Sequence, residues 1–116
     1  MKIHHIGIYV SNLEKSVAFY GKIAAIQSKE KLKWNETELL FIKGEGFQLE
    51  LIPDSNGVSK STHIAFTVNC VKEKIRDLQH KGLLPSEGPY HLENGWKTVF
   101  YEGPDGEEIE FIEIVR

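Results

Sequence analysis

The chain has few cysteines, no long apolar run and no recognisable signal peptide, the three sequence features that would indicate secretion or a membrane. It carries one cysteine, Cys70, so no disulfide can form within it, and a reducing compartment is expected. Its apolar runs all fall short of the roughly 18 residues that a membrane-spanning helix needs. Its first residues already have the pattern of a β-strand, so no signal peptide is predicted. We therefore expect a cytoplasmic protein with no membrane partner.

The charges are scattered along the chain, and arginine is scarce. Lys and Arg number 14 against 17 Asp and Glu, for a net charge of −3, and no basic stripe of the kind that binds nucleic acid is present. Only Arg76 and Arg116 are arginine. Because arginine is the usual bidentate partner of carboxylate and phosphate, a strongly anionic small molecule would have to be held by lysine, backbone amides or a metal.

What the chain does contain is an internal repeat within a length of 116 residues, which suits one domain or two small modules. Apolar periodicity predicts, in the first half, strands at 3–10, 28–34, 37–43 and 46–53 and a helix from 12 to about 26. In the second half it predicts strands at 61–68, 84–91, 96–102 and 107–115 and a helix at 70–81, ended by Gly82. We expect an α+β fold of two βαβββ modules, about 1–53 and 61–116, with a polar linker at 54–60.

Two His/Glu pairs follow the same repeat. His63 comes 58 residues after His5, and Glu110 comes 60 residues after Glu50. Each His opens an apolar strand that leads into a helix, and each Glu lies inside a later apolar strand, where burial of a charged group is expensive. Imidazole and carboxylate together suit a divalent metal such as Zn, Ni, Co, Mn or Fe. The repeat therefore predicts one metal ion held by four side chains.

The alternation of side chains along the strands supports this prediction. Successive residues of a strand point to opposite faces of the sheet. In all four strands, the His or Glu lies on the face opposite an apolar layer. In the first histidine strand that layer is Ile6, Ile8 and Val10, and we expect it to pack against the helix. In the second histidine strand it is Ile64, Phe66 and Val68. If the sheet curls, the four polar side chains would converge inside it.

Three stretches make the chain similar to the vicinal oxygen chelate superfamily, which includes glyoxalase I, extradiol dioxygenases, methylmalonyl-CoA epimerase and the fosfomycin and bleomycin resistance proteins. They are HHIGIYVSNLEKSVAFY at 4–20, THIAFTV at 62–68 and GPDGEEIEF at 103–111. Three ligand positions of that family fall on His5, His63 and Glu110. The fourth, which varies among subfamilies, falls on Glu50, where Glu resembles glyoxalase I.

The resemblance implies an architecture and a chemistry. Two βαβββ modules would form a curved mixed sheet around the metal, completed in a homodimer. The metal would chelate two oxygens of a small-molecule substrate, and Glu110 or Glu50 would move a proton in a lyase or isomerase reaction. The expected substrate pocket differs from that of glyoxalase I, because Tyr9 stands in place of an arginine and Lys22–Ile26 replaces a Leu-Gly-Phe segment.

Three alternatives remain open within the superfamily. A metal-dependent dioxygenase prefers three protein ligands and open positions, so Glu50 argues against it. The scarcity of arginine argues against a thiol transferase of the fosfomycin-resistance type. A drug-binding protein of the bleomycin-resistance type typically lacks the ligands that this chain keeps. Of the other histidines, His4 and His80 are expected to be structural, and His91 is expected in a loop at 89–95.

Overall fold

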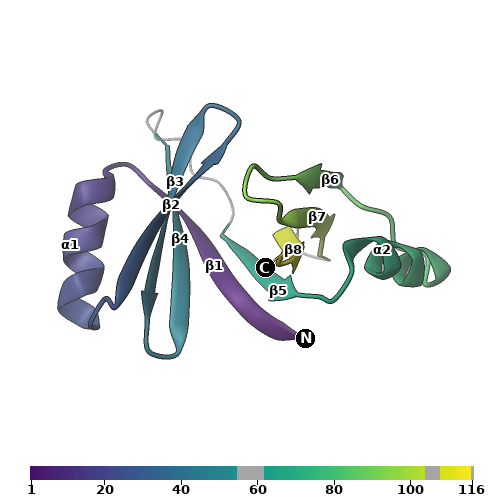
Figure 1. Ribbon diagram of the computed structural model, residues 1–116, viewed down its shortest axis with the longest axis horizontal. Helices are drawn as coiled ribbons and strands as arrows, with labels where there is room; N and C mark the ends of the chain where they lie inside the picture. Colours follow the sequence, from purple (N-terminus) through teal and green to yellow (C-terminus); the bar gives the residue numbers. More distant parts are fainter. Residues whose placement is uncertain (55–61, 104–107, 116) are drawn as a thin grey trace. The chain divides into compact units, whose positions relative to one another are not determined.

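The computed structural model describes residues 1–54, 62–103 and 108–115. Over these residues the chain forms eight strands and two helices, which belong to two compact units (Figure 1). The unit formed by His5–Thr62 is called the N-terminal module. The C-terminal module comprises His63–Arg116 together with Met1–His4. The predicted linker at 54–60 lies almost entirely outside the described residues.

The N-terminal module has the predicted βαβββ order. Its elements are β1 (Lys2–Val10), of which the residues from His5 onward belong to this module, α1 (Leu13–Ile23), β2 (Ser28–Trp34), β3 (Thr37–Gly44) and β4 (Phe47–Pro53). Strand β1 runs parallel to β4, whereas β2, β3 and β4 pair antiparallel, so the order across the sheet is β2-β3-β4-β1. Helix α1 covers one face of this mixed sheet (Figure 1).

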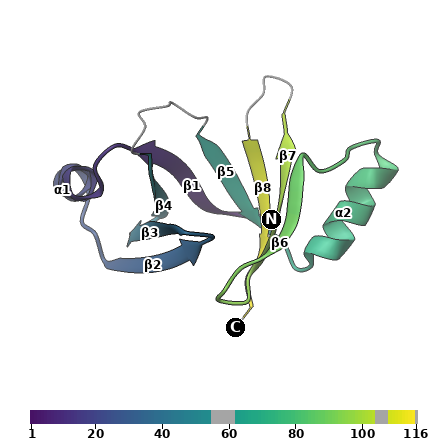
Figure 2. The same cartoon turned by 90° about the horizontal axis from the view of Figure 1, so that it is seen from above.

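The C-terminal module repeats this topology. Its elements are β5 (His63–Thr67), α2 (Val71–His80), β6 (Glu87–His91), β7 (Lys97–Glu102) and β8 (Glu108–Glu113). Strand β5 runs parallel to β8, and β6, β7 and β8 pair antiparallel, in the order β5-β8-β7-β6. Figure 2 shows α2 lying alongside the sheet of this module. The predicted α+β fold of two βαβββ modules is confirmed.

Helix α1 begins as the sequence predicts but ends earlier. The Asn12 side chain caps it by accepting a hydrogen bond from the backbone N–H of Lys15 at 3.0 Å. We expected the helix to continue to about residue 26, but it ends at Ile23. Ala24 has an extended backbone, with φ −148° and ψ 151°, and its N–H still donates to the Tyr20 carbonyl at 3.0 Å. The chain must leave the helix there to enter β2.

Helix α2 ends at the predicted glycine. Gly82 has a φ of +83°, which a residue without Cβ adopts readily. Its N–H donates to the Gln79 carbonyl at 3.0 Å, and the Leu83 N–H donates to the Leu78 carbonyl at 2.9 Å. These two bonds form a Schellman motif. Neither helix in the described parts of the chain is both long and apolar enough to span a membrane.

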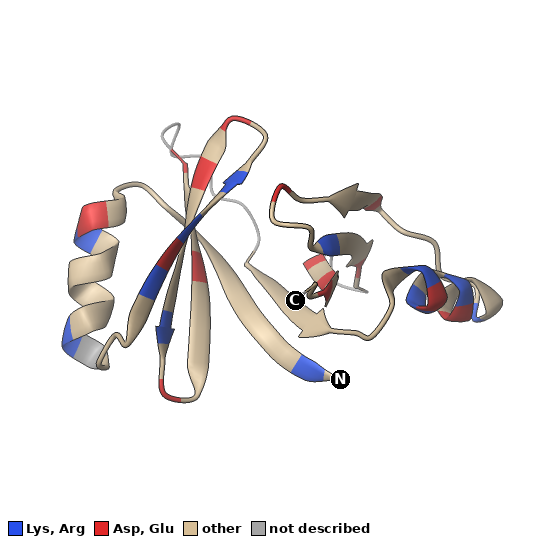
Figure 3. Cartoon of the chain, viewed as in Figure 1, with Lys and Arg blue, Asp and Glu red and all other residues tan. Residues whose placement is uncertain are grey.

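Each module has its own hydrophobic core between its helix and one face of its sheet. The N-terminal core is built around buried Val10, Ile42 and Leu51, against which Leu13, Val17 and Tyr20 of the helix pack. The C-terminal core is built around Val71, Val99, Tyr101 and Phe111, with Ile75 and Leu78 of the helix. Charges of both signs are interspersed along α2 and along β2 and β3 (Figure 3). Each helix therefore packs on an apolar face of the sheet of its own module.

One part of the predicted apolar layer is wrong. Ile6 was expected to pack beneath the helix, but it is 37% exposed. Ile64, at the equivalent position of β5, is 40% exposed. In β1 the helix-side core includes Ile8 and Val10 but not Ile6. In β5 it includes Phe66 but not Ile64. Each helix thus covers only the later part of the strand that precedes it.

Candidate metal centre

In the N-terminal module, His5 of β1 and Glu50 of β4 lie side by side on the sheet face away from α1. Gly7 is the register partner of Glu50, so His5 is two residues earlier on the same face. Both side chains are buried, with 1% and 4% exposure, and Nε2 of His5 is 3.4 Å from Oε1 of Glu50. Phe41 of β3, the other neighbour of Glu50, sets its ring edge-on to that of His5 at a centroid distance of 5.2 Å.

The C-terminal module builds the same arrangement from His63 of β5 and Glu110 of β8. Ala65 is the register partner of Glu110, so His63 again lies two residues earlier on that face. Both residues are buried, and Nε2 of His63 is 3.2 Å from Oε1 of Glu110. Phe100 of β7 is the other neighbour of Glu110, and its ring is T-shaped to His63 at 6.3 Å. The sequence repeat is therefore also a repeat of side-chain geometry.

The distances in the two pairs fit a pair of metal ligands. A charge-assisted N–H···O hydrogen bond is usually about 2.7–2.9 Å long. Two ligand atoms, each about 2.1 Å from one metal at a tetrahedral angle, lie roughly 3.4 Å apart. The observed separations of 3.4 and 3.2 Å are closer to the second value. A buried carboxylate also needs a cation or hydrogen bonds, so the donor set and its spacing both suit a divalent metal.

A residue that sequence reasoning missed contacts one of the glutamates. Thr98 of β7 is fully buried, and its hydroxyl donates to Oε2 of Glu110 at 2.5 Å. It lies two residues before Phe100 and therefore on the same face of the sheet. The available signal was the alternation in β7, where Val99 and Tyr101 belong to the helix-side core and Thr98 does not. Strand alternation predicts the sheet face on which Thr98 lies, but it does not predict that the Thr98 hydroxyl is within hydrogen-bond distance of Glu110.

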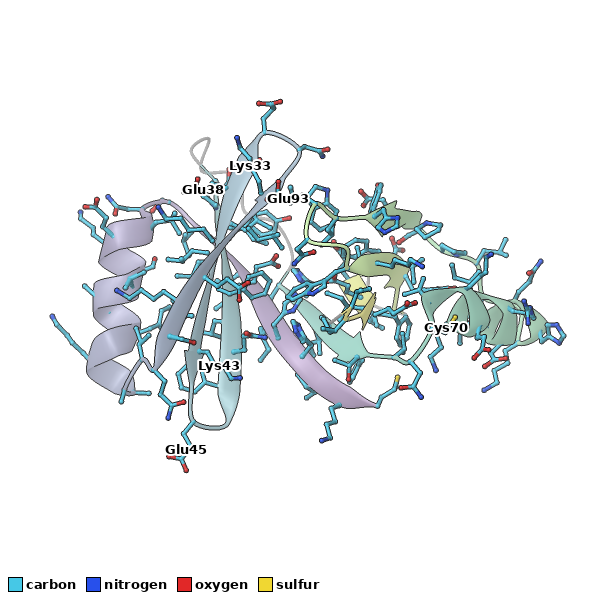
Figure 4. The ribbon with its side chains drawn as sticks, in the orientation of Figure 1. Lys33, Glu38, Lys43, Glu45, Cys70 and Glu93 are labelled. Atoms are coloured by element: carbon cyan, nitrogen blue, oxygen red, sulfur yellow. The ribbon has the colours of Figure 1, made fainter. Side chains whose placement is uncertain are left out.

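The remaining histidines and the cysteine lie elsewhere. His4 is half-buried and packs edge-on against Trp96 at a centroid distance of 5.2 Å. His80 is exposed at the end of α2, as expected. His91 was expected in a loop but is the last residue of β6, where it pairs with Lys97. Cys70 is the half-buried residue immediately before α2, at the helix side of its sheet (Figure 4).

Two tyrosines of the C-terminal module have shifted acidities. A hydrogen bond from the Tyr90 hydroxyl to Oε1 of Glu87, at 2.5 Å, raises the pKa of Tyr90. Burial raises the pKa of Tyr101, whose hydroxyl has no hydrogen-bond partner among the described residues. Tyr101 belongs to the helix-side core, so its shift reflects packing and not the chemistry of the His/Glu face.

Several known proteins are similar to this chain. The metallothiol transferase FosB of Lysinibacillus sphaericus is 32% identical over 114 residues, which cover 94% of this chain and 79% of that protein. A probable trivalent organoarsenical cleaving enzyme of Bacillus subtilis is 32% identical over 120 residues, which cover 96% of this chain and 79% of that protein.

Solved structures show the same fold. A variant of Streptomyces coelicolor methylmalonyl-CoA epimerase, bound to 2-nitronate-propionyl-CoA, matches with a TM-score of 0.75 at 21% identity, over 100% of this chain and 99% of that one. The family model for the Glyoxalase/Bleomycin resistance protein/Dioxygenase superfamily matches residues 2–111. Because that match covers nearly the whole chain, the chain belongs to this superfamily.

Proposed function

We propose that His5, Glu50, His63 and Glu110 together bind one divalent metal ion, and that the protein is a glyoxalase-like metalloenzyme. The observation that carries this proposal is the repeated geometry of two buried His/Glu pairs, with N···O separations of 3.4 and 3.2 Å. One such pair could be a structural feature of a sheet. Two pairs in matching register, each on the face away from a helix, supply the two imidazoles and two carboxylates of a four-ligand site. Zn, Ni, Co, Mn and Fe all accept this donor set.

The proposed reaction is proton transfer within a small substrate that presents two oxygens. The bound metal supplies a Lewis acid that polarises those oxygens. Glu50 or Glu110 would accept the proton from one carbon and return it to the neighbouring atom, which gives an isomerase step. In a lyase step the electron pair left by that proton would instead expel a leaving group from the adjacent atom. Phe41 and Phe100, packed against the two imidazoles, keep the rings in place and exclude water from that side. A four-ligand set leaves fewer open positions than oxygen activation needs, so a dioxygenase reaction is less favoured.

Metal-dependent thiol transfer is the second candidate. It is supported by the 32% identity with the metallothiol transferase over 94% of this chain. The scarcity of arginine argues against an anionic thiol co-substrate. Cleavage of a trivalent organoarsenical fits less well, because trivalent arsenic binds thiols. The single thiol of this chain, Cys70, lies at the start of α2 on the helix side of its sheet.

Elemental analysis of the purified protein tests the proposal. The protein is offered Zn, Ni, Co, Mn and Fe in turn and is compared with a Glu50→Gln, Glu110→Gln double variant. A matched control carries the same two charge changes at exposed positions, Glu45→Gln and Glu102→Gln (Figure 4 labels Glu45). We expect about one metal per chain in the wild type and the control, and loss of the metal in the double variant. If none of the five metals binds the wild type, the metalloenzyme proposal is wrong.

The metal-loaded protein is then screened with hemithioacetals and catechols. Product formation without loss of thiol indicates the isomerase or lyase reaction, whereas consumption of a thiol favours the second candidate. As part of the same proposal we expect a cytoplasmic homodimer, which light scattering during size-exclusion chromatography would detect as a mass twice the 13.2 kDa of one chain. Elution of the metal-loaded protein at the mass of one chain contradicts that part.

A further inference from the structure

The two carboxylate oxygens of Glu110 have different neighbours within the C-terminal module. Oε1 lies 3.2 Å from Nε2 of His63. Oε2 accepts a hydrogen bond from the Thr98 hydroxyl at 2.5 Å. Glu110 and Thr98 are 2% and 0% exposed, so this bond is shielded from water. The direction of the carboxylate plane is thereby fixed from two sides.

The residue of the N-terminal module that corresponds to Thr98 cannot supply such a hydrogen bond. Phe41 pairs with Glu50 as Phe100 pairs with Glu110. Leu39 lies two residues before Phe41 on β3, at the position that corresponds to Thr98. Leu39 is 3% exposed. An isobutyl side chain cannot donate a hydrogen bond. The two halves of the candidate site therefore share their imidazole, carboxylate and phenyl side chains, but the hydroxyl of Thr98 has no counterpart at Leu39.

We infer that Thr98 is a positioning residue, which orients Glu110 so that Oε1 is presented to the metal and Oε2 is held away from it. This role rests on the proposed metal site. A hydrogen bond to one oxygen favours ligation through the other and reduces the freedom that the carboxylate would lose on binding the metal. Outer partners of this kind typically contribute roughly 10- to 100-fold to metal affinity. Thr98 then fixes the orientation of the Glu110 carboxylate.

The test measures Co²⁺ binding to the full chain by chelator competition and records the visible absorption spectrum of the Co²⁺ form. Thr98→Val keeps the branched shape but removes the hydroxyl, and Thr98→Ser keeps the hydroxyl. Thr67→Val is the matched control: Thr67 also lies on a strand of this module, but its hydroxyl donates to the Lys2 carbonyl at 3.3 Å. We expect Thr98→Val to weaken Co²⁺ binding roughly 10- to 100-fold and to change the spectrum, while Thr98→Ser and Thr67→Val resemble the wild type.

Each other result has a definite meaning. If Thr98→Val binds Co²⁺ with the affinity and spectrum of the wild type, the positioning role is wrong although the metal site stands. If Thr98→Val does not fold, as judged by circular dichroism, Thr98→Ala replaces it. Weakened binding in Thr98→Ala but not in Thr98→Ser then supports the role, and equal binding in both overturns it. If the wild type itself binds no Co²⁺, the proposed function fails, and the role of Thr98 fails with it.

Discussion

Loss of the Glu110 carboxylate should remove most of the thermal stabilisation that a bound metal gives. A metal that binds only the folded state, at 100 times its dissociation constant, adds about 2.7 kcal/mol to the free energy of unfolding. An unfolding entropy of about 2.1 cal/mol/K per residue gives roughly 0.24 kcal/mol/K for this chain of 116 residues. The melting temperature should therefore rise by about 11 °C on addition of metal to the wild type.

Glu110→Gln preserves the size of the side chain but removes one of two anionic ligands. In the wild type, Oε1 of Glu110 is buried and lies 3.2 Å from Nε2 of His63. Solvent therefore cannot replace the charge that the variant loses. If the dissociation constant rises about 100-fold, the same metal concentration adds only about 0.4 kcal/mol, or about 2 °C. Differential scanning calorimetry with and without metal gives this increment for each protein, so differences between the metal-free proteins cancel.

Glu102→Gln is the control, because Glu102 is an exposed residue of β7 in the same module. It should keep the full increment of the wild type. The reasoning is refuted if metal raises the melting temperature of Glu110→Gln as much as that of the wild type. The metal would then bind elsewhere, for example at the exposed imidazoles of His80 and His91.

Three further predictions concern stability and are measured by denaturant unfolding. Asn12→Ala should lower the free energy of unfolding by about 1 kcal/mol, since it removes the α1 cap on the Lys15 N–H; an unchanged midpoint would contradict this. Glu113→Ala should lower the free energy of unfolding by roughly 1 kcal/mol, because Oε1 of Glu113 accepts a hydrogen bond from the N–H of Val71 at 2.9 Å. Glu113→Gln keeps an acceptor oxygen and should retain much of that stability. Tyr101→Phe should be neutral or stabilising by up to about 1 kcal/mol at pH 7, because it removes a buried hydroxyl that has no partner among the described residues. Burial raises the pKa of Tyr101, so the unfolded chain ionises first and the wild type loses stability as the pH rises through about 10; the phenylalanine variant should lose less, and equal loss in both would contradict the assignment.

The two ends of α2 show where reasoning from the sequence succeeds and where it fails. Gly82 was identified as the end of the helix because the required positive φ is a property of one residue. The start was assigned to Cys70, which is indeed the N-cap but makes no side-chain capping bond. The acceptor for Val71 comes instead from Glu113, 42 residues later. A cap supplied from another strand has no local sequence signature.

The candidate site divides in the same way. The sequence alone determined the two βαβββ modules, the repeated His/Glu pairs and the faces on which they lie, because side-chain direction follows from strand periodicity and the spacing repeats. Only the tertiary structure placed Nε2 of His63 beside Oε1 of Glu110, brought Thr98 to the second carboxylate oxygen, and left Ile6 and Ile64 outside the helix-packed cores. Periodicity states which way a side chain points. The register between strands and the position of the helix decide what it meets there.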